Sequence, residues 1–272
     1  MSISGKIAFV GAGNMGEALI RGLLASKAIA PAEIRVSDSR KTRLDELQQR
    51  YGVTVCGSNI AAVEEAAAVV FCVKPQILQT VARETKEAIP AEAVVISVAA
   101  GKSSALLEAC LAPGARVVRA MPNVAALVGE GATAVSAGAH ATDDDVRTAV
   151  AMFEPVGRVL VVDESAMDAV TGLSGSGPAF IFMVIEALSD AGVKVGLSRW
   201  DSHALACQTV LGAAKLVIET QEHTGRLKDM VCSPGGTAIA AVHTLEQGGL
   251  RTTLINAVEV ATRRARELGD RE

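Results

Sequence analysis

The stretch Lys6-Ile7-Ala8-Phe9-Val10-Gly11-Ala12-Gly13-Asn14-Met15-Gly16 decides how the first half of this chain folds. The apolar run 7–10 is typical of a strand buried on both faces, and the apolar residues of 17–26 recur at helical spacing. Between them lies a G-x-G-x-x-G pattern. Its first glycine makes the turn, its second lets backbone approach a pyrophosphate, and its third lets the helix pack on the strand. Because a helix N-terminus attracts anions, the stretch predicts a dinucleotide site, with an ordinary glycine-rich turn as the alternative.

Length and composition indicate a globular protein. The 272 residues allow one large domain or two ordinary ones, and 50% of them are hydrophobic, enough for a substantial core. The formal net charge is only −4, without a long basic or acidic run, so no electrostatic case exists for nucleic acid or a membrane surface. We therefore expect small-molecule partners.

Cysteine and histidine usage indicates neither disulfides nor metal. The 5 cysteines are widely spaced without a C-x-x-C pair, and the 4 histidines share no metal spacing. The N-terminus lacks the pattern of a signal peptide, and the longest uncharged run, 169–185, contains several glycines and a proline and is shorter than a membrane span. We expect a cytoplasmic protein with reduced thiols, no metal site and no membrane segment.

Strand-like and helical segments alternate up to residue 162, which predicts a mostly parallel sheet wound by right-handed crossovers. The expected strands are 7–10, 34–37, 53–55, 68–73, 94–98, 116–119, 133–137 and 158–162. The expected helices between them are 17–26, 41–50, 77–88 and 143–153.

Beyond Asp163 the strand-like runs stop, and we expect helices at 167–193, 199–222, 236–248 and 250–268. The predicted fold class is α/β, with a Rossmann-type domain over 1–163 and an all-α domain over 164–272. The helix 166–191 is long for a domain of this size, so we expect another subunit to cover part of its apolar surface.

Three further motifs go beyond a generic dinucleotide domain: Val73-Lys74-Pro75-Gln76, the run 168–179 with Leu173-Ser174-Gly175-Ser176-Gly177-Pro178, and Ser233-Pro234-Gly235-Gly236-Thr237. Together with the first motif, they make the chain resemble the pyrroline-5-carboxylate reductase family from residue 6 to about residue 268. The resemblance implies a Rossmann domain, a helical dimerisation domain, and NAD(P)H-dependent reduction of 1-pyrroline-5-carboxylate to L-proline. It also implies a homodimer that can assemble into a homodecamer.

The resemblance implies particular site residues. The pyrophosphate would lie on Gly11, Ala12, Gly13, Asn14 and Met15, with Gly16 completing the motif. The other positions beside the cofactor would be Asn59, Val73, Lys74, Pro75, Ala99 and Ala100, with Met121, Pro122 and Asn123 near the nicotinamide. The substrate would contact Glu164, Ser233, Gly235, Gly236, Thr237 and Ala238. The family commonly has threonine at the place of Ala238 and Met-Pro-Asn-Thr-Pro at 121–125, and this chain departs from both patterns.

The residues themselves support the substrate loop. The glycines before the helical pattern at 236–248 leave backbone N–H groups open to a carboxylate, although Ser233 as a plain N-cap is the alternative. Ser233 and Thr237 are the candidates for catalytic hydroxyls. Glu164 could balance the iminium charge or be a surface carboxylate, and Lys74 alone would more often be a solvated charge.

Cofactor choice depends on the residues after the second strand. Asp38 there would favour NADH, because an acidic side chain binds the ribose hydroxyls and repels a 2′-phosphate. Ser37, Ser39 and Arg40 around it can hold that phosphate, and we expect NADPH with NADH as the alternative.

Two other functions remain open. A relative acting on a six-membered imine differs only in pocket shape, and a sensor without turnover would have little use for the substrate loop. Related hydroxyacid dehydrogenases carry a lysine and an asparagine where this chain has Ile181 and Ile185, which is evidence against alcohol oxidation.

Overall fold

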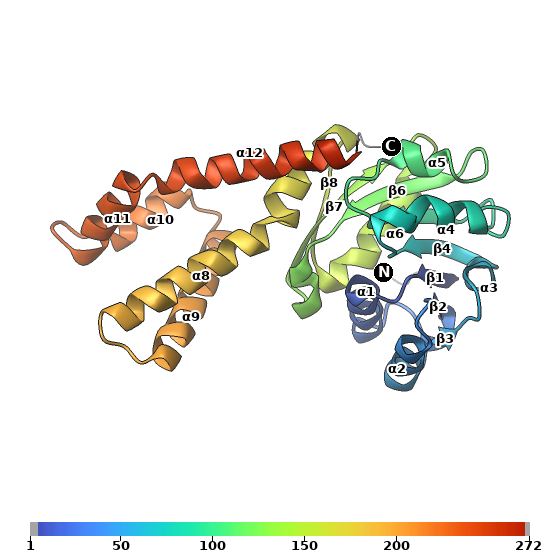
Figure 1. The fold of residues 1–272 in the computed structure, drawn as a ribbon, viewed down its shortest axis with the longest axis horizontal. Helices are drawn as coiled ribbons and strands as arrows, with labels where there is room; N and C mark the ends of the chain where they lie inside the picture. The colour runs from blue at the N-terminus through green and yellow to red at the C-terminus, as the bar shows by residue number, and fades with distance from the viewer. Residues whose placement is uncertain (1–4, 270–272) are drawn as a thin grey trace. The chain divides into compact units, whose positions relative to one another are not determined.

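The computed structural model describes residues 5–269. The first half of the chain forms one sheet of 8 strands in the order β3-β2-β1-β4-β5-β6-β7-β8 (Figure 1). The strands are β1 (Lys6–Val10), β2 (Ile34–Ser37), β3 (Thr54–Val55), β4 (Ala66–Phe71), β5 (Val94–Ser97), β6 (Arg116–Met121), β7 (Gly131–Ala137) and β8 (Gly157–Val161). All neighbours pair in parallel except β6 and β7, which are antiparallel. The predicted Rossmann-type, mostly parallel sheet is confirmed, strand by strand.

Helices cover both faces of the sheet, because alternate strand residues are apolar on either side. In β1, Ile7 and Phe9 belong to one core cluster, while Ala8 and Val10 belong to the other. The first cluster is closed by α1 (Asn14–Ala25), α2 (Lys41–Tyr51) and α6 (Asp143–Phe153). The second is closed by α3 (Asn59–Val63), α4 (Leu78–Thr85) and α5 (Ser104–Glu108). The short helices α3 and α5 were not predicted, since 5 residues are too few to show a helical period.

By packing, the described chain divides into two units. The first holds the chain up to Ser176 and from Val260 onward, and the second holds Gly177–Glu259. This division differs from the expected boundary at residue 163, which follows the end of the strands, since β8 ends at Val161. The second unit contains only helices, as expected: α8 (Gly177–Lys194), α9 (Arg199–Thr220), α10 (Thr224–Val231), α11 (Thr237–Gln247) and the first part of α12 (Leu250–Gly269). Of these, α10 was not predicted.

The segment before α8 is helical but not regular. A short helix, α7 (Met167–Val170), is followed by a π-helical turn at Thr171–Gly175. Hydroxyls in this segment bond back to carbonyls of the preceding turn, Thr171 to Met167 and Ser174 to Val170, at 2.9 and 3.1 Å. Such back-bonding competes with the regular helical pattern, and π-turns occur frequently at functional sites.

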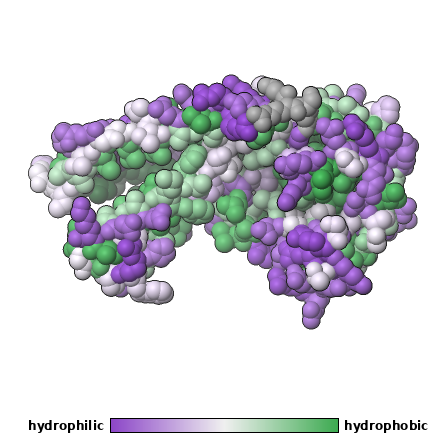
Figure 2. Space-filling view, in the orientation of Figure 1, coloured by the Kyte–Doolittle hydropathy of each residue, from purple (hydrophilic) through white to green (hydrophobic). Residues whose placement is uncertain are grey.

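The second unit buries little of its own apolar surface. Its buried residues among those described are Ser189, Ser202, Ala206 and Leu227, while Phe182, Met183 and many other large apolar side chains are exposed. Figure 2 shows this apolar surface in green where Figure 1 places α8. The helical segment 164–194, which extends beyond the uncharged run 169–185 at both ends, has the length and composition of a membrane span. A helix covered by another protein surface passes the same test.

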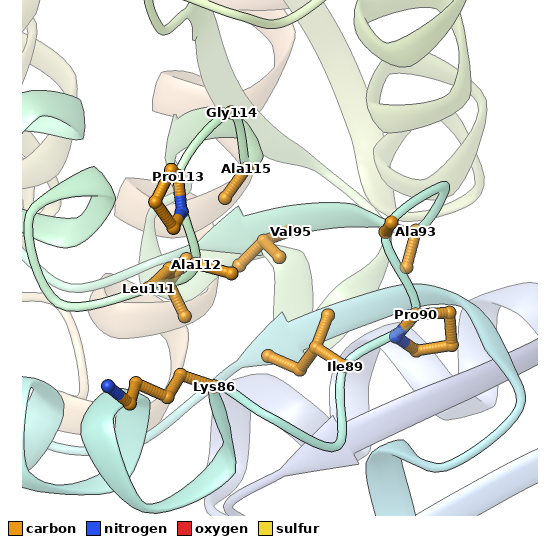
Figure 3. A pocket seen from close by; sticks show the side chains of 11 residues that line it. Lys86, Ile89, Pro90, Ala93, Val95, Leu111, Ala112, Pro113, Gly114 and Ala115 are labelled. Carbon is orange, nitrogen blue, oxygen red and sulfur yellow. The ribbon is translucent and has the colours of Figure 1, made fainter.

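One small cavity, of about 140 Å³, lies at the amino ends of the strands, whereas the glycine turn lies at a carboxyl end. Its lining includes Ala93 and Ala115, which come directly before β5 and β6 (Figure 3). Ligands of open parallel sheets bind outside the carboxyl ends of the strands. The cavity therefore lies at the end of the strands opposite to the one where a cofactor is expected.

Candidate active site

The glycine turn after β1 has the geometry that a pyrophosphate site needs. Gly11 has φ +99°, and a Cβ there would lie 2.8 Å from the Cys72 carbonyl carbon. A Cβ on Gly16 would lie 2.7 Å from the Gly11 oxygen, whereas one on Gly13 would meet nothing within 4 Å. Gly13 is also the N-cap of α1 and supplies no side-chain cap. The first N–H groups of α1 therefore face open space, in which a side chain at position 13 would stand.

Both backbone polar groups of Ala12, the residue between the first two glycines, are hydrogen-bonded to side chains. The Ala12 N–H donates to Asp38 Oδ2 at 2.8 Å, and the Ala12 carbonyl accepts from Arg43 Nε at 2.8 Å. Asp38 follows β2, and Arg43 lies in the first turn of α2. Side chains of the next β-α unit thus shape the loop.

Asp38 is already fully engaged. Besides the Ala12 N–H, it accepts from the backbone N–H of Arg40 at 2.9 Å and from the Arg40 guanidinium at 3.0 and 3.2 Å. Burial raises the pKa of Asp38, but these hydrogen bonds outweigh burial and hold the pKa below its ordinary value. The carboxylate is therefore ionised and bonded internally, while the side chain of Arg40 is 60% exposed.

A second carboxylate, Glu17, lies in the first turn of α1 and is surrounded by donors from α2. It accepts from Arg43, from Arg50 Nη1 at 2.7 Å and from the Tyr51 hydroxyl at 2.9 Å. Burial raises its pKa, but Arg43, Tyr51 and Arg50 together bring the pKa below the ordinary value. Arg43 was not predicted, because it lies 26 residues from Glu17 and 31 from Ala12 in the sequence, and no local pattern links them.

Ser37 and Asn59 are joined to each other. Ser37 is buried, and its hydroxyl donates to Asn59 Oδ1 at 2.9 Å; the Asn59 amide donates to Glu84 at 3.0 Å. The Ser37 side chain is therefore engaged by Asn59, and among the residues predicted to hold a 2′-phosphate only Ser39 and Arg40 are exposed.

The other predicted cofactor residues all follow carboxyl ends of strands. Val73, Lys74 and Pro75 come after β4, with Lys74 exposed, and Ala99 and Ala100 come after β5. Because the carboxyl ends of parallel strands meet at one edge, these residues share that edge with the glycine turn.

The end of β6 is tied to the π-turn. Asn123 donates from its amide nitrogen to the Ser174 carbonyl at 3.0 Å, and its amide oxygen accepts from two backbone N–H groups at 3.2 Å. A Cβ on Gly175 would lie 2.6 Å from Met121 Cε. Met121, Pro122 and Asn123 are thus fixed against the segment that leads into α8.

Glu164, predicted to contact the substrate, has a protein partner. Its Oε1 accepts from Arg119 Nη1 at 2.8 Å and from the Ser104 N–H at 3.2 Å. The Arg119 side chain is 6% exposed, and Arg119 Nη2 and Glu164 Oε2 are buried without a hydrogen-bond partner. The structure therefore places Glu164 in an ion pair of the first unit, and its contact with substrate stays a prediction.

The substrate loop lies in the second unit, before α11. The helix begins at Thr237 with Gly236 as N-cap and no side-chain cap, so Ser233 is not the N-cap. Gly235 has φ +69°, and a Cβ on Gly236 would lie 2.3 Å from Ser233 Oγ. Ser233 and Thr237 are exposed, and Ala238 is half-buried. The loop thus has two exposed hydroxyl-bearing residues beside a helix N-terminus without a side-chain cap.

A mostly parallel sheet with an open glycine turn at its first crossover defines a dinucleotide-binding domain. Residues 6–101 match the family model described as NADP oxidoreductase coenzyme F420-dependent, and residues 164–268 match Pyrroline-5-carboxylate reductase dimerisation. The pyrroline-5-carboxylate reductase of Methanosarcina acetivorans is 47% identical over 97% of this chain and 98% of its own. Those of Arabidopsis thaliana and Escherichia coli are 45% and 38% identical, each over 97% of this chain and over 95% and 98% of theirs. The chain belongs to the pyrroline-5-carboxylate reductase family.

Solved structures of pyrroline-5-carboxylate reductases are similar to this one over nearly the whole chain. The pyrroline-5-carboxylate reductase of Coxiella burnetii superposes with a TM-score of 0.93 at 36% identity, covering 98% of this chain and 100% of that one. The pyrroline carboxylate reductase of Plasmodium falciparum, solved with NADP bound, superposes with a TM-score of 0.88 at 30% identity, over 99% and 100%. No group of three potential metal ligands occurs between residues 5 and 269.

Proposed function

We propose that this protein reduces 1-pyrroline-5-carboxylate to L-proline with NADPH, the last step of proline biosynthesis. The full-length likeness to reductases of this name carries the proposal. The helices α1 and α11 both begin without a side-chain cap, which leaves one N-terminus for the cofactor pyrophosphate and one for the substrate carboxylate.

The glycine turn fits the cofactor, because a Cβ at Gly13 would fill the space in which the backbone approaches the pyrophosphate. A bound NADPH supplies the hydride that adds to the imine carbon. A protonated imine is already electrophilic, and its proton stays on the nitrogen in the product, so no strong general acid is required. The protein's contribution is then to bind and orient the substrate.

We assign the residues accordingly. The pyrophosphate contacts the turn from Gly11 to Gly16. The residues that follow β4 and β5 and those at the end of β6 border the rest of the cofactor, and Ser37 and Asn59 bond each other beside them. The substrate carboxylate binds to the N–H groups at the start of α11 and to the hydroxyls of Ser233 and Thr237. Where Ala238 replaces the usual threonine, Thr237 supplies the remaining hydroxyl.

The assembly we propose is a homodimer through the C-terminal helices, with a decamer as the larger form. The exposed apolar side chains of α8 and α9 support it, as does the match of residues 164–268 to a dimerisation region. We place the protein in the cytoplasm, with no nucleic acid or membrane partner.

The test is NADPH oxidation with the five-membered and the six-membered imino acid. Faster turnover of the five-membered ring is expected. Faster turnover of the six-membered ring would reassign the substrate, and binding of NADPH without turnover of either would indicate a sensor.

A further inference from the structure

The backbone N–H and the carbonyl oxygen of Ala12 are both hydrogen-bonded. Asp38 accepts its N–H and Arg43 donates to its carbonyl, both at 2.8 Å. Arg43 is itself fixed, since Nη2 donates to Glu17 and Nη1 donates to Glu46 Oε2 at 3.2 Å. All three nitrogens of the guanidinium therefore donate to protein oxygens, in the fork geometry that only arginine provides.

The same guanidinium offsets an unfavourable charge. Glu17 lies in the first turn of α1, the helix whose N-terminus faces the open space at Gly13. A carboxylate there favours the helix but repels a second anion at the same end. Arg43 and Glu17 are 16% and 17% exposed, so solvent screens this repulsion only in part.

We propose that Arg43 is a positioning residue for the cofactor, which orients the Ala12 peptide and masks the charge of Glu17 so that the pyrophosphate can bind at the start of α1. Arg43 acts through the loop and through Glu17. This inference rests on the cofactor site proposed above.

The measurement is NADPH affinity of the free protein by fluorescence titration, independent of turnover. Arg43→Ala removes a charge-assisted hydrogen bond and unmasks Glu17, so the dissociation constant is expected to rise about tenfold or more. Arg43→Lys keeps the charge but not the fork, and an intermediate loss is expected even if the alanine variant folds poorly. Thermal unfolding without cofactor checks that each variant is folded.

A double-mutant cycle separates masking from direct contact. If Arg43 masks Glu17, Glu17→Gln improves NADPH affinity far more in the Arg43→Ala background than in the wild type. If Arg43 simply contacts the pyrophosphate, the two changes add, and the masking role is overturned.

Two controls locate the effect. Arg50→Ala removes a cation from Glu17 without touching Ala12, so a clearly smaller loss is expected; an equal loss would show that the contact with Ala12 contributes nothing. Binding of 2′-AMP, which lacks the pyrophosphate, should not change in Arg43→Ala. An equal loss for 2′-AMP and NADPH would place Arg43 at the 2′-phosphate and overturn the inference. Failure of the wild type to bind NADPH would overturn the proposed function itself.

Discussion

Asp38 shows how a single residue changes role with its partners. An acid after the second strand usually accepts hydrogen bonds from the ribose hydroxyls and so favours NADH. In this protein its oxygens already accept from Ala12 and Arg40, while the Arg40 side chain is 60% exposed. Arg40 is therefore held by Asp38 while its side chain stays largely exposed, and we expect the guanidinium to bind a 2′-phosphate.

We expect Arg40→Ala to raise the Michaelis constant for NADPH about tenfold, because a charge-assisted hydrogen bond is lost. The constant for NADH should stay the same or fall, since Asp38 becomes available to the ribose. Steady-state kinetics with both cofactors measures this. An unchanged constant for NADPH would place the phosphate elsewhere, and Lys41→Ala, one residue further on, is the matched control.

Glu17 predicts a pH dependence of stability. Its folded pKa lies below the ordinary value of 4.5, so ionised Glu17 contributes stability that is present above that value and lost as pH falls through the folded pKa. We expect the melting temperature of the wild type to fall more steeply than that of Glu17→Gln from about pH 6 to about pH 3. Parallel curves for the two proteins would mean that the Glu17 ion pairs contribute nothing to stability.

Among the elements, α9 and α11 begin in different ways. Ser198 caps α9, its hydroxyl accepting from the Asp201 N–H at 3.1 Å, whereas Gly236 leaves α11 without a side-chain cap. A helix end left uncapped beside two glycines is better suited to bind an anion than to stabilise the fold.

This difference predicts opposite results for two serine variants. Ser198→Ala should destabilise the protein by about 1 kcal/mol and leave the Michaelis constant for the imino acid unchanged. Ser233→Ala should leave the melting temperature unchanged but weaken the imino acid about tenfold, and it should weaken 1-pyrroline, which lacks the carboxylate, far less. Calorimetry and kinetics on both variants check this, and equal losses for the two substrates would make the loop structural.

For the whole molecule, the second unit buries few of its own described residues. Four described residues are buried in it, while Phe182 and Met183 on α8 are 61% and 69% exposed. Apolar surface of this extent indicates a partner, and for a dimerisation region the simplest partner is a second copy.

We expect an obligate dimer, whose melting temperature rises with protein concentration. Phe182→Asp, which places a charge on the apolar face, should shift the protein to monomer in sedimentation velocity and abolish activity. Lys194→Ala, at the end of the same helix, should leave the assembly unchanged. A stable, active monomer at micromolar concentration would contradict the dimer.

Local sequence patterns were enough to predict the sheet, the glycine turn and the helical second half. These follow from local patterns: buried strands are short apolar runs, and Gly11 and Gly16 occupy places where a Cβ would collide with backbone. The start of α11 was also visible, because glycines precede a helical period at 236–248.

The pairs of charged groups became apparent only in the folded chain. Asp38 bonds the N–H of Ala12 and Arg43 bonds its carbonyl, from 26 and 31 residues along the sequence. Glu164 pairs with Arg119 at a separation of 45 residues. No periodicity encodes such pairs, since they depend on which strands become neighbours and where long side chains reach. The same is true of burial in the second unit, because an apolar helix has the same sequence whether its own chain or a partner covers it.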